Sequence, residues 1–508
     1  MLISTQAPAA TCCKWLPQAY LQGSLLLSLP GRTLEKASVD CSERKLTMPS
    51  KLVEGSFRDP SGFVFSVDGS IYRQVNEVYQ ENYDHLMASK LYDSLVEAEL
   101  LIPHEETSEV SSPSPQSAYK LIKPRMIPFV SYPYEWCFSQ LKDAALTTLA
   151  IQKTALKFGM TLKDCSAYNI QYCGAKPVFI DTLSFEKYVE GMPWTPYKQF
   201  CQHFLAPLAL MSSVDIRLNG LLQSNIDGIP LDLASSLLPK SSRFSFPLLL
   251  HIHLHAKSQN RYSDEVIERK KFTQKVSKTA LLGLIESLES AIKKYTWKPA
   301  GTEWAEYYSD DSYVASAFEH KQSIVKEYLS LAKPKVLWDM GANNGFFSRL
   351  ADDAGAYTVA FDVDPACVEM NYLQGKKSGE VGMLPLLLDL TNPSANRGWA
   401  NDERLSILQR SCGDTAMALA LIHHLAISNN VPLIKIAQFF GSICRSLIIE
   451  FVPKSDHKVK KLLGTREDVF PSYTKEGFEE AFGSVFTIER CDPIADSERT
   501  MYLLTRKN

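Results

Sequence analysis

From residue 320 onward, short apolar runs alternate with longer stretches in which apolar residues recur every three or four positions. The runs are VLWDM, TVAFDV, MLPLLLDL, AMALALI and SLIIEFV. Apolar runs that alternate with helical segments are typical of a parallel sheet with helices on both faces. Near the C-terminus, SVFTIERCDPI and TMYLLTR add two strands that are close enough in sequence to pair as a hairpin. The pattern therefore predicts an α/β domain with a Rossmann-like, seven-stranded sheet over residues 297–508.

The N-terminal part of the chain has a different pattern. GFVFSVDGSIYRQV alternates apolar and polar residues and carries Asp68-Gly69 at its centre, which is the two-residue signature of a β-hairpin. A helical stretch, two short strands and a long helix follow, and Ser139 is the expected N-cap of the long helix. Later segments are mainly helical until WKPAGTEW breaks the pattern. We therefore predict an α+β domain over residues 51–296, with the next domain beginning at residue 297.

Composition narrows the classes of function. Hydrophobic residues make up 45% of the 508 residues, charged residues 22%, and the net charge is −3, so the chain lacks the basic excess of nucleic-acid-binding proteins. No stretch has the roughly 18–20 uninterrupted apolar residues of a membrane-spanning helix. The eleven cysteines lack CxxC spacing and mostly lie in apolar runs, as expected for reduced thiols in the cytoplasm. We expect neither a nucleic acid nor a membrane as partner, and we expect residues 1–50 to form a disordered leader.

The sequence VLWDMGANNGFFSRL contains a glycine-bearing turn between a predicted strand and a predicted helix. Asp339 lies near the end of the apolar run, Gly341 and Gly345 follow it, and Asn343 between them is a further candidate ligand-binding residue. Glycines at such a turn let backbone amides and the N-terminus of the next helix approach a ligand without obstruction by side chains. The spacing differs from the GxGxxG of dinucleotide-binding folds. The turn indicates a pocket for a nucleotide-like ligand, and the neighbouring strands must supply the rest of it.

Two more acids follow the next two predicted strands. AFDVD places Asp362 at the C-terminal end of the second predicted strand, where a carboxylate can accept hydrogen bonds from both hydroxyls of a ribose. LLLDL places Asp389 at the end of the third predicted strand, a place suited to the exocyclic amine of adenine. Together with Asp339, these residues put three acids at three consecutive strand ends beside the glycine turn. The alternative for each acid is a structural role as the cap of a helix or turn.

DMGANNG and FDVDP resemble the corresponding motifs of the class I S-adenosylmethionine-dependent methyltransferases. The resemblance implies that S-adenosyl-L-methionine is the cofactor. It implies that Gly341 and Gly345 line the methionine and ribose part of that cofactor, and that Asp339 lies near its amino group. By the same resemblance, Asp362 holds the ribose and Asp389 holds the adenine.

The fourth predicted strand, AMALALIHHL, ends in His423 and His424. The resemblance implies that this strand end faces the transferred methyl group. A histidine there can remove a proton from a hydroxyl or amine nucleophile, because its pKa suits that task near neutrality. Alternatively, the two rings form a hydrogen-bonding wall. We take His424, and next His423, as the catalytic candidates, with Glu450 at the end of SLIIEFV as a further polar group.

The same strand end lacks the [DN]PP[FY] pattern that in the family accompanies methylation of planar amide or base nitrogens. The resemblance therefore argues against a nucleobase acceptor. Just before the sheet, GTEWAEYYSDDSY carries four aromatic residues. These residues either fold over the sulfonium of the cofactor or pack against the edge of the sheet.

Three longer stretches resemble a narrower group of bacterial proteins, the NoeA-type nodulation and host-specificity methyltransferases. The stretches are ALIHHLAISNNVPL, LIIEFVPKSDHKVKKLLGTREDVFPSYT and EWCFSQLKDAALTTLAIQKTAL. The resemblance runs from about residue 55 to the end of the chain. It implies the reaction class, methyl transfer, and leaves the acceptor open between a small molecule and a protein.

LKDCSAYNIQYCGAKPVFID, in the N-terminal domain, contains an acid, an asparagine and then a short apolar strand that ends in Ile-Asp. Asp164, Asn169 and Asp181 thereby resemble the catalytic base and the two magnesium ligands of the protein-kinase-like superfamily. The sequence departs from that superfamily because no glycine-rich loop precedes it, Lys163 stands where His-Arg is usual, and Thr-Leu follows Asp181 in place of Phe-Gly. The plain alternative is a loop between a helix and a strand, with Asp181 as a turn acid.

The sequence therefore predicts an S-adenosylmethionine-dependent methyltransferase whose N-terminal domain recognises or presents a small-molecule or protein acceptor. Methyl transfer itself requires no metal, so none is expected at the sheet edge. Two alternatives stay open. One is a kinase-like phosphotransfer protein whose second domain senses S-adenosylmethionine. The other is a non-catalytic scaffold that binds the cofactor and transfers nothing.

Overall fold

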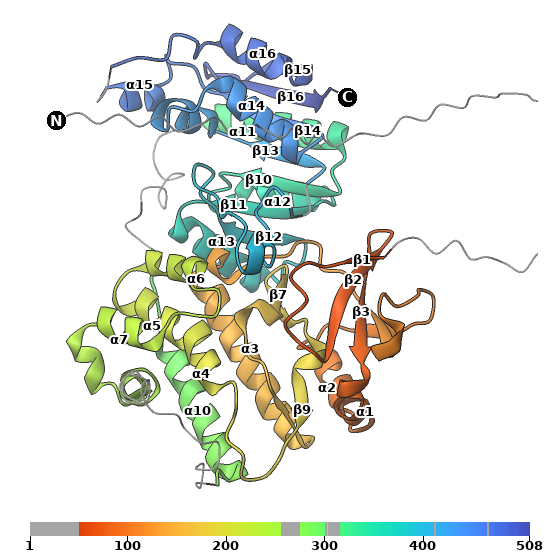
Figure 1. Cartoon of the computed structure of the whole chain (residues 1–508). Coiled ribbons are helices and arrows are strands. Elements are labelled where there is room, and N and C mark those ends of the chain that lie inside the picture. Colours follow the sequence, from red (N-terminus) through yellow and green to blue (C-terminus); the bar gives the residue numbers. More distant parts are fainter. Residues whose placement is uncertain are drawn as a thin grey trace, which may run out of the picture. The chain divides into compact units, whose positions relative to one another are not determined.

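The structure is a computed structural model that describes residues 50–255, 275–299, 302, 315–410, 413–464 and 467–507 (Figure 1). Met48–Asn508 form one compact unit. The predicted leader lies outside the described residues except for its last position. Within the described ranges, no helix combines the length and the apolar character that crossing a membrane requires.

The C-terminal part contains a seven-stranded sheet with the strand order β12-β11-β10-β13-β14-β16-β15. Its strands are β10 (Val336–Met340), β11 (Tyr357–Asp362), β12 (Met383–Leu387), β13 (Thr415–Ala418), β14 (Ser446–Phe451), β15 (Phe486–Pro493) and β16 (Thr500–Arg506). The pairings from β12 to β14 are parallel, whereas β16 is antiparallel to both of its neighbours. The chain moves outward in both directions from β10, and open sheets of this kind bind ligands at that point of reversal.

Helices cover both faces of this sheet. They are α11 (Ala315–Ala332), α12 (Phe346–Asp353), α13 (Pro365–Ser378), α14 (Leu433–Ile443), α15 (His457–Leu463) and α16 (Lys475–Gly483). Leu337 and Met417 belong to one apolar cluster with residues of α11 and α12. Their sequence neighbours Trp338 and Ala416 belong to a second cluster, which includes residues of α13, α14 and α16. Because alternate strand residues face opposite sides of a sheet, the predicted Rossmann-like, seven-stranded architecture is confirmed.

The N-terminal part begins with a five-stranded antiparallel sheet of order β1-β2-β3-β5-β4. The strands are β1 (Lys51–Leu52), β2 (Gly62–Val67), β3 (Ser70–Asn76), β4 (His104–Glu106) and β5 (Ala118–Pro124). The predicted hairpin is confirmed, since β2 and β3 are joined by Asp68 and Gly69, whose φ angles are 49° and 74°. Positive φ at both central residues gives a tight turn that matches the twist of the paired strands.

Two small sheets and a set of helices complete the N-terminal part. Strand β6 (Met160–Leu162) pairs with β9 (Phe185–Lys187), and β7 (Ile170–Cys173) pairs with β8 (Lys176–Phe179). The helices are α1 (Gln80–Ala88), α2 (Leu91–Glu97), α3 (Phe138–Lys157), α4 (Tyr197–Phe200), α5 (Ala206–Ser213), α6 (Leu221–Ser224), α7 (Leu231–Leu237), α8 (Phe246–Leu248) and α10 (Lys278–Lys294). Sheets and helices are thus mixed here as the α+β prediction requires.

The predicted N-cap of the long helix α3 is wrong. The helix begins at Phe138 with Cys137 as its N-cap, so Ser139 is already inside the first turn. The backbone N–H of Ser139 donates a 2.9 Å hydrogen bond to Glu369, and the Ser139 hydroxyl donates to the same carboxylate. Glu369 belongs to α13, 230 residues later in the chain. An acid from another part of the molecule therefore satisfies an N–H group that the helix itself leaves unpaired.

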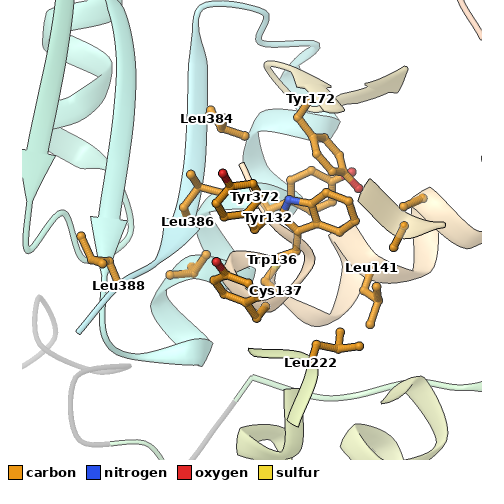
Figure 2. Packing of buried hydrophobic residues seen from close by; sticks show 14 of the residues in the cluster. Tyr132, Trp136, Cys137, Leu141, Tyr172, Leu222, Tyr372, Leu384, Leu386 and Leu388 are labelled. Atoms are coloured by element: carbon orange, nitrogen blue, oxygen red, sulfur yellow. The ribbon is translucent and has the colours of Figure 1, made fainter. Parts of the chain in front are cut away.

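The two parts of the chain share one apolar core. Figure 2 shows Trp136 and Tyr172 of the N-terminal part beside Tyr372 of α13 and Leu384 of β12. All four side chains are fully buried. The rings of Tyr172 and Tyr372 meet edge to face, with centroids 6.0 Å apart, which is a favoured geometry for aromatic pairs.

A second set of contacts reaches the strands that carry the candidate site. Phe129 packs edge-on against Trp338 of β10 and Phe361 of β11, with ring centroids 5.7 Å and 5.9 Å away. Arg410, from the segment between β12 and β13, donates to Glu135 at 2.8 Å through Nη1 and at 2.5 Å through Nη2. Both charged side chains are almost completely buried. The N-terminal part therefore supports β10 and β11 directly.

Candidate functional site

The turn after β10 has the backbone that its sequence predicts. Gly341 and Gly345 have φ angles of 82° and 80°, in the left-handed region that favours glycine. Asn343 between them also has a positive φ, 50°, which asparagine adopts more readily than most residues. Gly345 is the N-cap of α12, and a Cβ atom there would lie 2.4 Å from Oδ1 of Asn371. Both the conformation and the close approach of Asn371 therefore require glycine at position 345.

Asp339 is buried at the base of the turn, with 2% of its surface exposed. Its carboxylate accepts a 2.6 Å hydrogen bond from the hydroxyl of Ser348, which lies in α12. Burial raises the pKa of Asp339 to about 7, although the hydrogen bond from Ser348 and the charge of Lys321 oppose the rise. A cationic ligand beside Asp339 would favour its ionised form.

Asp362 ends β11 and connects two turns. Its Oδ2 accepts a hydrogen bond from the backbone N–H of Asn343 at 2.7 Å, and its Oδ1 accepts one from the N–H of Asp364 at 2.9 Å. Each carboxylate oxygen has a second lone pair, so Asp362 can still accept hydrogen bonds from a ligand. Burial raises the pKa of Asp362 to about 6, although the backbone hydrogen bonds oppose the rise. The side chain is therefore mostly ionised at neutral pH.

Asp389 lies two residues beyond Leu387, the last residue of β12, and is exposed. Its Oδ1 accepts hydrogen bonds from the N–H and the hydroxyl of Thr391, at 2.8 Å and 2.7 Å. These are the bonds of an acid that stabilises a turn, which is the structural alternative stated for this residue. Asp389 also lines the same cavity as Asp339 and Asp362, so a ligand contact is compatible with its role in the turn.

All three acids line one cavity of about 380 Å³, which is within the size range of small-molecule sites. The cavity lies at the chain reversal between β10 and β13. Its other lining residues are Lys321, Gly341, Ala342, Asn343, Phe347, Phe361, Val363, Leu388, Leu390, Thr391, Leu419, Ala420, Leu421, His424, Leu425, Ser428, Asn429 and Leu462. Gly345 is not among them, and its place is at the start of α12.

The predicted end of the fourth strand is wrong. Strand β13 ends at Ala418, and the histidine pair follows it in a separate turn, with His424 beginning the π-helix His424–Ser428. The apolar run continues past the strand because it forms the cavity wall, while Ala420, with a φ of 51°, departs from the strand conformation. His424 lines the cavity, whereas His423 is 2% exposed and is not among the lining residues.

Both histidines are held in their neutral forms. Burial, together with the charges of Arg499 and Lys458, lowers the pKa of His424 to about 4. Burial also lowers the pKa of His423 well below its ordinary value. An imidazole with so low a pKa is a weak base near neutrality. These pKa shifts favour a hydrogen-bonding wall over a general base.

A buried network of charges lies beneath the cavity. Glu450 of β14 accepts hydrogen bonds from Nζ of Lys321 at 2.6 Å, from Nη1 of Arg499 at 3.2 Å, and from the N–H of Ala420 at 2.8 Å. Arg499 also donates to Asp456 at 2.8 Å. Burial lowers the pKa of Lys321, and Glu450 opposes that effect. No motif in the sequence identifies Lys321 or Arg499 as part of this network. Glu450, which the sequence does suggest as a polar group, holds the loop after β13 in place through the N–H of Ala420.

The kinase-like residues lie in the N-terminal part and are not among the residues that line the cavity. Asp181 accepts hydrogen bonds from the hydroxyl of Ser184 and from the N–H of Leu183, and it forms a 2.5 Å ion pair with Arg73. Nδ2 of Asn169 donates to the Ser184 hydroxyl at 3.3 Å. Ser184 therefore connects the two predicted magnesium ligands.

Asp164, the predicted kinase-like base, accepts a 2.8 Å hydrogen bond from the N–H of Ser166. The preceding Lys163 forms an ion pair with Asp59 at 3.2 Å. Among the residues that the structure describes, no three or more His, Cys, Asp or Glu side chains are grouped to hold a metal ion. The aromatic segment predicted to cover the cofactor, residues 301–313, lies outside the described residues apart from Thr302.

No sequence-family profile matches the chain. The nodulation protein NoeA of Rhizobium meliloti (strain 1021) is 34% identical over 461 residues, which cover 89% of this chain and 96% of that protein. A solved structure of the bifunctional kinase-methyltransferase WbdD matches 39% of this chain and 41% of its own, with 14% identity and a TM-score of 0.28. Magnesium protoporphyrin IX methyltransferase from Synechocystis PCC 6803, with bound SAH, matches 40% and 93%, with 17% identity and a TM-score of 0.30. Because the identity to NoeA extends over nearly all of both chains, this protein belongs to the NoeA family.

Proposed function

We propose that this protein is an S-adenosylmethionine-dependent methyltransferase that acts on a small-molecule or protein acceptor. The observation that carries the proposal is the cavity beside the glycine turn, where Asp339, Asp362 and Asp389 meet at the ends of three neighbouring strands. In an open α/β sheet, the edge at the carboxyl ends of the strands is where ligands bind.

The groups at the cavity fit this cofactor chemically. Apart from its carboxylate, S-adenosylmethionine presents an ammonium group, a sulfonium, two ribose hydroxyls and the adenine amine, which are cations or hydrogen-bond donors. Ionised carboxylates only accept hydrogen bonds, so three of them in one cavity match such a ligand. Asp362, with lone pairs to spare, suits the two hydroxyls, whereas exposed Asp389 suits the adenine amine. Buried Asp339 suits the ammonium group.

When bound, the cofactor would supply a methyl group on a positively charged sulfur. Its transfer would join the methyl carbon to the acceptor's nucleophile and break the carbon–sulfur bond, whose electron pair would stay on sulfur. The protein's contribution is to position the acceptor and exclude water. Leu419 and Leu421 form an apolar wall, which Glu450 holds through the N–H of Ala420. Neutral His424 can accept a hydrogen bond from a hydroxyl or amine nucleophile, whose proton passes to solvent as the methyl group moves.

Methyl transfer can be measured before the acceptor is identified. Purified protein, labelled S-adenosylmethionine and a fractionated cell extract are incubated together, and products are identified by mass. We expect the wild type to label a product and Asp362→Ala to lose that activity. Asp353→Ala removes an exposed acid at the end of α12 and should retain it. If the wild type binds the cofactor yet labels nothing in any fraction, the non-catalytic scaffold becomes the better account.

A second candidate function is nucleotide binding or phosphotransfer by the N-terminal part. The observation in its favour is that Asp181, Asn169 and Arg73 converge through one ion pair and Ser184. Calorimetry with ATP and magnesium tests it, since binding should be lost in Asp181→Ala and kept in Asp362→Ala. Absence of ATP binding in the wild type would remove this candidate.

A further inference from the structure

The two ends of the cavity differ in charge. The end formed by β10, β11 and β12 contains the three acids assigned to the cofactor. The other end is formed by the segment after β13 and by α15, and it contributes His424, Ser428, Asn429 and Leu462 with apolar leucines. No acid from these two segments lines the cavity. This second end therefore offers no carboxylate that could bind a cation.

Helix α15 makes the surroundings of this end basic. Its sequence, HKVKKLL, contains three lysines and no acid. Leu462 lines the cavity, and helical spacing places Lys458, four residues earlier, on the same side of the helix as Leu462. Lys460 projects from the opposite side. Helix α15 also packs against the π-helix that begins at His424.

Two further observations support a positive field at this end. The charge of Lys458 contributes to the lowered pKa of His424, so the ammonium group acts on a ring that lines the cavity. Two acids that flank α15 are paired with cations, because Asp456 binds Arg499 at 2.8 Å and Asp468 binds Lys454 at 2.7 Å. The cations that pair with these two acids, Arg499 and Lys454, both lie outside α15.

We propose that the methyl acceptor carries an anionic group, and that Lys458 holds this group at the mouth of the cavity. The proposal rests on the methyltransferase function proposed above and names the class of its acceptor. Leu421, Leu425 and Leu462 contact the apolar part of the acceptor, while Ser428 and Asn429 supply hydrogen bonds. A basic rim also raises the local concentration of an anionic molecule and speeds its capture.

Two fluorescent dyes of similar shape test the charge preference. The probes are 8-anilinonaphthalene-1-sulfonate, which is anionic, and N-phenyl-1-naphthylamine, which is uncharged. Each is titrated into protein saturated with S-adenosylhomocysteine, so that the cofactor end is filled. We expect Lys458→Glu to weaken binding of the anionic dye at least about fivefold, through lost attraction and new repulsion. The uncharged dye should bind all variants alike.

Lys460→Glu is the matched control, since it makes the same change of charge on the other side of the same helix. This variant should weaken binding of the anionic dye by less than about twofold. Equal losses in Lys458→Glu and Lys460→Glu, or equal losses of both dyes, would overturn the proposal. S-adenosylhomocysteine affinity, measured in parallel, reports on the cofactor site separately. If the wild type does not bind S-adenosylhomocysteine, the proposed methyltransferase function is wrong. The dyes, titrated into protein without that ligand, still show whether Lys458 attracts an anion.

Discussion

The backbone N–H of Asn343 donates a 2.7 Å hydrogen bond to the carboxylate of Asp362. This bond ties the turn after β10 to the end of β11, so the two elements that face the cofactor end of the cavity are held together by the protein itself. It also keeps the Asp362 carboxylate oriented before any ligand arrives. Preorganisation of this kind reduces the ordering that binding would otherwise require.

The first prediction concerns the geometry of that turn. Gly345→Ala should lower the free energy of unfolding by about 2–4 kcal/mol, because the new Cβ combines a left-handed backbone with a contact of 2.4 Å to Asn371. Gly355→Ala is the control, since Gly355 has a similar φ of 91° and open space around it. It should cost only about 1 kcal/mol. Chemical denaturation measures both, and equal losses would contradict the account of Gly345.

The second prediction is that cofactor binding releases protons. Burial raises the pKa of Asp339 to about 7 and of Asp362 to about 6, so both are partly protonated in weakly acidic solution. An ammonium group and ribose hydroxyls favour the ionised carboxylates, which lowers both pKa values on binding. We expect S-adenosylhomocysteine to release about one proton at pH 6.5 and close to none at about pH 8.5.

Calorimetry in buffers of different ionisation enthalpy counts these protons. Affinity should accordingly weaken as the pH falls from about 8 to about 5.5. Proton uptake on binding, or an affinity that does not change over this range, would mean that neither carboxylate faces the ligand.

The sequence predicted the sheet because buried parallel strands are continuous apolar runs, as VLWDM and SLIIEFV are. The same reasoning misplaced the end of β13, because the residues after Ala418 stay apolar in order to line a cavity. It also misplaced the cap of α3, because the acid that bonds Ser139 lies 230 residues away. Local patterns carry no information about partners at that distance.

One missed residue did leave a trace in the sequence. Lys321 occupies the buried stripe of α11 together with Ala317, Ile324 and Val325. A lysine on the apolar stripe of an amphipathic helix implies a buried acidic partner. That the partner is Glu450 follows only from the packing of α11 against β14, since 129 residues separate the two.

The third prediction concerns the ion pair between the two parts of the chain. Arg410→Met should lower the free energy of unfolding by about 3–5 kcal/mol, because it leaves the Glu135 carboxylate buried without its cation. Adding Glu135→Gln should restore much of that loss, since glutamine still accepts the hydrogen bond from the N–H of Tyr132. Chemical denaturation of the single and double variants measures this difference.

An exposed pair in the same part of the chain serves as the control. Lys176 and Glu99 are 57% and 68% exposed, so Lys176→Met should cost less than about 1 kcal/mol. If Arg410→Met cost no more than Lys176→Met, the buried pair would not join the two parts as described.

The fourth prediction is that His424 stays neutral across the physiological range. Burial lowers its pKa to about 4, so its ring should not titrate between about pH 6 and pH 8. Nitrogen NMR of the labelled imidazole, assigned with His424→Gln, checks this directly. Protonation of His424 near pH 6.5 would restore the general-base role that its burial argues against.

The account depends most on the carboxylates around the cavity, and calorimetry with S-adenosylhomocysteine tests them most directly. We expect the wild type to bind with a free energy of roughly −7 to −8 kcal/mol, and Asp362→Ala to bind at least about tenfold more weakly. Asp353→Ala should match the wild type. Absence of binding to the wild type, or an undiminished affinity in a folded Asp362→Ala protein, would contradict the assignment of this cavity.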